Sequence, residues 1–114
     1  DCSEQANTLT SLLRATGTSK ENVRVVLGLV DFDGNVGGHA WVEVYEDGNW
    51  FQLDATSGPY YDDQSRKLVQ SPGLDYNYFK FYPFPVIETW IYYNDIYFYD
   101  VEKGTGNAPN KWLN

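Results

Sequence analysis

The 114-residue sequence contains no methionine, one cysteine and one histidine. A single cysteine excludes an internal disulfide and a zinc site built from cysteines. No stretch approaches the roughly 18 consecutive apolar residues of a membrane-spanning helix, so no membrane span is predicted. The polar opening residues carry no targeting signal. Because methionine is absent and the chain opens within a helix cap, we expect it to be part of a longer polypeptide.

Basic residues are also few. The 8 Lys and Arg residues stand against 16 Asp and Glu residues, which gives a formal net charge of -8. Such a chain repels phosphate backbones, so nucleic acid is not an expected partner. The hydrophobic fraction of 42% and the aromatic fraction of 18% are ample for one packed domain of this length.

A helix is predicted over residues 1–16, where small and apolar residues recur at helical spacing. Asp1, followed three residues later by Glu4, resembles a capping box in which Asp replaces the usual Ser or Thr. This pattern puts Cys2 at the first helical position. Gly17 predicts the end of the helix, because glycine readily adopts the left-handed conformation found there.

Three strands follow in the prediction, over residues 23–30, 39–45 and 50–54. The segment between the first two has the composition of a turn. An EF-hand calcium loop requires Gly at its sixth position and Glu at its twelfth, where this sequence has Val36 and Val42, so no metal site is predicted. Asp47-Gly48, between the second and third strands, suits a two-residue type I′ turn.

Beyond residue 56 the chain becomes rich in aromatic residues, 15 of which lie between Tyr60 and Trp112. A further hairpin is predicted from residues 90–93 and 96–99. The interpretation is a single domain over residues 1–114, made of a core at 1–56, an aromatic-rich β extension at 57–103 and a loose tail at 104–114.

Two residues of the predicted core suit nucleophilic catalysis. Cys2 would sit at a helix N-terminus, where the helix dipole and free N–H groups favour the thiolate. His39, the one histidine, stands at the start of the second predicted strand behind Gly37 and Gly38. Glycines there permit close approach of another element, such as the end of a helix. A lone cysteine or histidine is more often structural, so the pattern depends on a third residue.

The third residue follows from strand register. If Asp47-Gly48 forms the two-residue turn, Trp41 lies opposite Asp54. Asp54 is then the diagonal neighbour of His39 on the same face, roughly 7–8 Å away and within reach of a side-chain hydrogen bond. The same register puts Trp41 on the His39 face. There it is predicted to contact substrate, to shield the site from water, or to pack on the sheet as an ordinary core residue.

These residues stand within strings that resemble the transglutaminase-like superfamily. Cys2 opens a helix that ends in Leu-Leu-Arg-Ala-Thr-Gly, His39 lies in Gly-His-Ala-Trp-Val-Glu-Val, and Asp54 lies in Leu-Asp-Ala-Thr. The order of the strings matches the family over residues 1–56, about half of the chain.

The resemblance implies an α+β, papain-like fold in which the cysteine helix packs on an antiparallel sheet. It also implies a triad in which Cys2 attacks an amide carbonyl, His39 protonates the leaving amine and Asp54 orients the imidazole. The expected function is acyl transfer or hydrolysis at a Gln, Asn or peptide amide of a protein substrate, without a cofactor. The Cys2 N–H is the expected oxyanion donor, and such enzymes usually take the second donor from upstream of the cysteine.

Two alternatives stay open. A transglutaminase-like module can be catalytically idle and bind protein or polysaccharide through its aromatic face. A cell-wall peptidase from another cysteine-hydrolase family also has a cysteine after an aspartate. Its third residue is often a further histidine, however, and this chain has one histidine.

Overall fold

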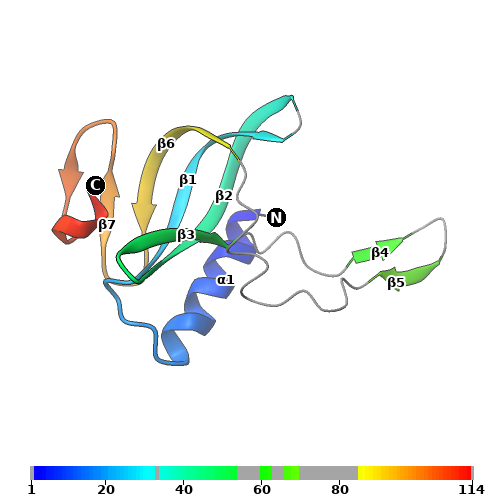
Figure 1. The fold of residues 1–114 in the computed structure, drawn as a ribbon, viewed down its shortest axis with the longest axis horizontal. Helices are drawn as coiled ribbons and strands as arrows, with labels where there is room; N and C mark the ends of the chain where they lie inside the picture. The colour runs from blue at the N-terminus through cyan, green and yellow to red at the C-terminus, as the bar shows by residue number, and fades with distance from the viewer. Residues whose placement is uncertain (1, 33, 54–59, 63–65, 70–84, 114) are drawn as a thin grey trace.

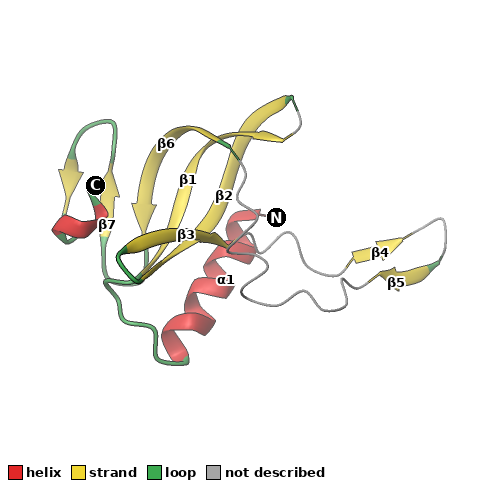
Figure 2. Cartoon of the chain, viewed as in Figure 1, coloured by secondary structure: helices red, strands yellow, loops and turns green. Residues whose placement is uncertain are grey.

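The computed structural model describes the whole chain except residues 1, 33, 54–59, 63–65, 70–84 and 114. In chain order the elements are α1 (Cys2–Ala15), β1 (Val23–Phe32), β2 (Asn35–Glu46), β3 (Asn49–Leu53), β4 (Tyr60–Asp62), β5 (Lys67–Val69), β6 (Val86–Tyr93), β7 (Phe98–Asp100), β8 (Thr105–Gly106) and the 3-10 helix η2 (Asn110–Trp112). Figures 1 and 2 show their arrangement.

The main sheet has six antiparallel strands in the order β3-β2-β1-β6-β7-β8, and β4 pairs separately with β5. Helix α1 packs on one face of the sheet against β1 and β2 (Figure 1). The predicted α+β class, with the cysteine-bearing helix on an antiparallel sheet, is therefore confirmed. Among the described residues, no helix is both long enough and apolar enough to cross a membrane.

Helix α1 ends where the sequence predicts. Gly17 has a φ of 111°, and its N–H donates to the Arg14 carbonyl at 3.2 Å. The Thr18 N–H donates to the Leu13 carbonyl at 2.9 Å. This pair of bonds is a Schellman motif, which satisfies carbonyls that have no partner within the helix. The predicted capping residue Asp1 lies outside the described residues.

The hairpin of β1 and β2 is longer than predicted. The first strand runs on to Phe32, and the second begins at Asn35 rather than at His39. Between them the Gly34 N–H donates to the Asp31 carboxylate at 2.7 Å, and Gly34 has a φ of 89°. The turn is thus in the predicted place, but most of the residues assigned to it belong to the strands.

This register corrects the prediction that His39 opens a strand. His39 lies inside β2, opposite Gly28, and Gly37 and Gly38 lie in the same strand before it. The element that approaches Gly38 is the Trp90 ring, which would lie 3.6 Å from a Cβ atom there, and not the end of a helix. The two glycines hid the strand because they pair through their backbone while offering none of the side chains that mark a strand in sequence.

The turn between β2 and β3 is the predicted type I′ turn. Asp47 and Gly48 have φ values of 52° and 82°, and both must be positive in this turn type. The predicted register follows from it and continues to Val42 opposite Leu53, the last described residue of β3.

The predicted aromatic hairpin is present as β6 and β7, with a longer loop than expected. Tyr93 pairs with Phe98, so the loop spans residues 94–97. The Asn94 side-chain oxygen accepts the Tyr97 N–H at 2.8 Å, and its amide nitrogen donates to the Val23 carbonyl at 2.8 Å. Asn94 therefore closes the loop and ties it to the start of β1.

The sheet buries side chains on both faces. Side chains alternate along each strand, and directly paired residues share a face. The α1 face holds the first cluster, formed by Ala6, Val23, Val25, Ala40, Val42, Val44 and Leu53. The opposite face holds the second cluster, formed by Val26, Val30 and Trp41, with Tyr92 packed against it.

Part of the segment predicted to be a loose tail, the 3-10 helix η2, is packed against the sheet through Trp112. Trp112 is fully buried, and its indole N–H donates to the Glu21 carbonyl at 2.9 Å. Its ring meets those of Trp50, Tyr92 and Tyr97 edge to face. The prediction was wrong because one tryptophan in a polar, glycine-containing stretch shows no periodicity, although burying that single ring can dock a short segment.

The sheet has no room for a side chain at Gly28 in β1. A Cβ atom there would lie 2.3 Å from the Glu88 carbonyl oxygen and 3.1 Å from the Trp41 ring. The pairing of β1 with β6 also shifts between Leu27 and Gly28. Glycine at this position therefore lets β6 and the Trp41 ring approach β1 closely.

Gly28→Ala is expected to lower the free energy of unfolding by about 1–3 kcal/mol, because the nearest atom belongs to the backbone and must shift. Gly37→Ala is the matched control, since no atom lies within 4 Å of a Cβ atom there. Urea unfolding followed by tryptophan fluorescence measures both. Equal midpoints for the two variants would contradict the close packing at Gly28.

Candidate active site

Cys2 opens helix α1 as a half-buried free thiol. It packs against the first cluster, which includes Ala40 and Val42 of β2 and Leu53 at the end of β3. The N–H groups of the first helical turn have no carbonyl partner within the helix, and the helix dipole is positive there. The position predicted for Cys2 is confirmed, and it favours negative charge on a ligand or side chain.

His39 is half-buried in β2. Its ring stacks on that of Trp41, with 6.1 Å between ring centroids and 20° between planes. Trp41 belongs to the second cluster, and the partner of His39, Gly28, alternates with Val26 and Val30 of that cluster. His39 therefore lies on the face of the sheet opposite to α1.

Asp54 lies outside the described residues. The register that predicts its place beside His39 holds as far as β3 is described, with Leu53 opposite Val42. One more step along this register would put Asp54 opposite Trp41. The proximity of Asp54 to His39 stays a prediction.

Cys2 and His39 reach the same stretch of β2 from different sides. Cys2 packs with Ala40 and Val42 on the α1 face, whereas His39 stacks on Trp41 on the other face. In the described part of the chain, β3 covers the edge of β2 only as far as Val42. The triad therefore stays a prediction.

The sequence analysis missed an ion pair on the His39 face. Arg24 of β1 lies opposite Glu43 of β2, and the carboxylate accepts from Nη2 at 2.7 Å and from Nε at 3.0 Å. Only 3% of the Arg24 side chain is exposed. Its guanidinium lies 3.8 Å from the centroid of the Trp50 ring and 3.7 Å from that of Tyr92. The available signal was a lone arginine inside a β-branched run, with a glutamate at matching register on the next strand.

Glu43 also holds Trp41. The Trp41 indole N–H donates to the second carboxylate oxygen of Glu43 at 3.2 Å. Trp41 is fully buried, so the predicted contact with substrate does not fit its place in the structure. The ring instead lies between His39 and the ion pair and separates them.

The elements that carry Cys2 and His39 correspond to a known family. Residues 1–55, which run from α1 past the end of β3, match the family described as the transglutaminase-like superfamily. The match covers just under half of the 114-residue chain. The match confirms the family that the sequence strings resemble. A search of the curated proteins and a search of the solved structures found no significant match.

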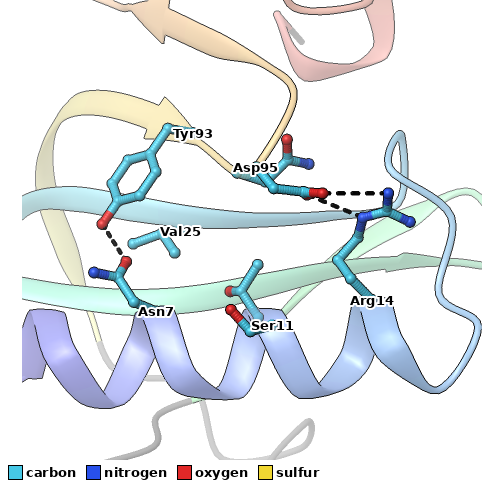
Figure 3. Close-up of a pocket in the computed structure, with 8 residues that line it drawn as sticks. Asn7, Ser11, Arg14, Val25, Tyr93 and Asp95 are labelled. Atoms are coloured by element: carbon cyan, nitrogen blue, oxygen red, sulfur yellow. Dashed lines mark hydrogen bonds and ion pairs between the residues drawn. The ribbon is translucent and has the colours of Figure 1, made fainter.

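A groove of about 350 Å³ lies on this transglutaminase-like domain between α1 and the loop after β6, and neither Cys2 nor His39 lines it (Figure 3). Arg14 Nε lies 3.0 Å from the Asp95 carboxylate across it, and this bond lowers the pKa of Asp95. The Tyr93 hydroxyl donates to the side-chain oxygen of Asn7. These bonds fasten α1 to the end of β6 and to the loop after it, so we assign the groove a structural role.

The environment of Tyr92 predicts sensitivity to alkali. Burial raises the pKa of Tyr92, and the neighbouring charge of Arg24 partly offsets this. A phenol with a raised pKa stays protonated in the native state at pH values where the unfolded chain ionises. Its contribution to stability is therefore complete below the ordinary value of about 10 and is lost as pH rises through the folded-state pKa.

We expect the free energy of unfolding to fall as pH rises from about 9 to about 11, and to fall less in Tyr92→Phe. Guanidinium unfolding at several pH values measures the slope. The slope of Tyr93→Phe is measured for comparison with that of Tyr92→Phe, because burial also raises the pKa of Tyr93. The same slope for Tyr92→Phe and the parent protein would contradict the environment described for Tyr92.

Proposed function

We propose that the chain supplies the catalytic residues of a papain-like, thiol-dependent enzyme that transfers or hydrolyses the acyl group of an amide. The observation that supports this most is that residues 1–55 match the transglutaminase-like superfamily, with Cys2 at the first position of α1. A helix start is where a thiolate is most stabilised by backbone N–H groups.

In the proposed reaction the Cys2 thiolate attacks the amide carbonyl carbon and forms a C–S bond. The Cys2 backbone N–H donates to the oxyanion that develops. As the C–N bond breaks, protonated His39 gives its proton to the leaving amine, and a thioester remains. Water or an acceptor amine, deprotonated by His39, then attacks the thioester and releases the thiolate. Asp54 is proposed to orient His39 throughout.

The proposed substrate is a protein that presents a Gln, Asn or peptide amide. The net charge of -8 would draw basic, lysine-bearing partners toward the domain. We favour hydrolysis over cross-linking, because water is the acceptor available to any site that does not exclude it.

One observation favours a second candidate function. Cys2 packs against the α1 face of the sheet, while His39 stacks on Trp41 on the other. If the two side chains never meet, the domain is catalytically idle and binds protein or polysaccharide. Exposed aromatic side chains on β6 and β7, Trp90 and Phe98, suit such binding.

The pH dependence of Cys2 alkylation by iodoacetamide separates the two candidates. The reaction is unambiguous because Cys2 is the one cysteine of the chain. A thiolate stabilised by the helix and by an imidazolium gives a rate profile with its midpoint below about pH 7, whereas an ordinary thiol gives about 8.5. His39→Ala is expected to move the midpoint upward.

The control is the same profile for the protein unfolded in guanidinium, in which helix and imidazole no longer act on the thiol. A folded-state midpoint equal to that of the unfolded chain, and unchanged by His39→Ala, would contradict the enzyme proposal and support the binding module.

A further inference from the structure

A continuous series of contacts on the face of the sheet opposite α1 ends at His39. It begins at Arg24, which binds Glu43 through two donors. Glu43 accepts the Trp41 indole N–H at 3.2 Å, and the Trp41 ring stacks on His39 at 6.1 Å between centroids. Each member occupies a defined place in the fold, so the orientation of each constrains the next.

The first member is fixed from several sides. The Arg24 guanidinium lies between the rings of Trp50 and Tyr92 and donates from Nη1 to the Trp112 carbonyl at 2.9 Å. Arg24 Nε and Nη2 both donate to one carboxylate oxygen of Glu43. The other carboxylate oxygen accepts the hydrogen bond from the Trp41 indole N–H. The carboxylate is thereby held in one orientation.

The indole is fixed as well. Trp41 is fully buried, and its ring fills the space that Gly28 leaves on β1, where a Cβ atom would be 3.1 Å away. A buried side chain with a hydrogen bond at one end and close packing at the other has no alternative rotamer without a cavity or a clash. Trp41 therefore presents a rigid ring to the half-buried His39.

We propose that Trp41, oriented by Glu43, is the positioning residue for the catalytic imidazole of His39. The inference rests on the proposed function. A histidine on the middle of a strand can turn about two side-chain torsions, and the stacked indole restricts that freedom before substrate arrives. Catalysis gains from such pre-organisation because the reacting groups must be held in one geometry.

The charges around Trp41 indicate that it acts on the orientation of His39 through packing and not through electrostatics. The described elements bring Arg24, Glu43, Tyr45, Tyr92 and Lys111 to this side of the sheet. Glu43 is neutralised by Arg24 at 2.7 Å, and the indole itself does not titrate. Loosening Trp41 should therefore disturb where the imidazole points while leaving the ion pair in place.

Trp41→Phe tests the link. Phenylalanine keeps an aromatic ring next to His39 but has no N–H for Glu43, and the Arg24–Glu43 pair stays. Trp50→Phe is the matched control, because it also removes an indole N–H bond on the same face, to the Lys111 carbonyl at 3.1 Å, while it keeps an aromatic ring over Arg24. The readouts are the Cys2 alkylation profile and the NMR signal of His39, the one histidine of the chain.

Trp41→Phe is expected to slow Cys2 alkylation at pH 7 about fivefold, as for two directly coupled residues, and to move its midpoint upward. The His39 imidazole signal should shift and broaden in the same variant. Trp50→Phe should keep the alkylation rate within about twofold of the parent rate, whatever stability it loses.

The outcomes distinguish the two proposals. An alkylation profile that His39→Ala leaves unchanged would overturn the proposed function and the positioning role together. If His39→Ala slows alkylation while Trp41→Phe behaves like Trp50→Phe, only the positioning role is overturned. Should Trp41→Phe not fold, the double variant Arg24→Met with Glu43→Met removes the acceptor and its charge partner together and should give the same fivefold slowing. An unaltered rate in that variant would overturn the positioning role.

Discussion

The buried ion pair of Arg24 and Glu43 is the interaction on which one whole face of the sheet depends. It joins β1 to β2 at the point where aromatic side chains from β3 and β6 cover it, and the carbonyl of Trp112 adds the C-terminal segment. A buried charge without a partner is costly, so every element that packs here must accommodate the pair. This face of the sheet thus packs a buried charge beside the second cluster.

The other constraint is the alternation of side chains along β2. Ala40 and Val42 point to α1 and complete the aliphatic cluster under Cys2, while His39, Trp41 and Glu43 point to the opposite side. The proposed nucleophile and base are thus attached to two different packing environments.

Local signals in the sequence predicted the parts of the fold that local chemistry decides. The end of α1 at Gly17 and the positive φ angles at Asp47 and Gly48 follow from glycine and turn chemistry alone. The register of β2 on β3, and hence the shared face of His39 and Trp41, then follows from the turn. These features could be read from short windows because each is fixed within a few residues.

Features decided by contacts between distant segments were missed or misplaced. Trp112 is buried by residues far away in the chain, and no local pattern distinguishes it from an exposed tryptophan in a tail. Arg24 sits between valines in a largely apolar strand, and its partner is 19 residues away in sequence. The start of β2 was misplaced because Gly37 and Gly38 hide a strand that only its pairing with β1 reveals.

The most direct test of this account is a double-mutant cycle on the free energy of unfolding with Arg24→Met, Glu43→Gln and the combined variant. Each single variant leaves one member of the pair buried without its partner and is expected to cost about 3–5 kcal/mol, whereas the combined variant should cost less than the two costs added together. Single costs below about 1 kcal/mol that simply add in the combined variant would contradict the central role of the ion pair.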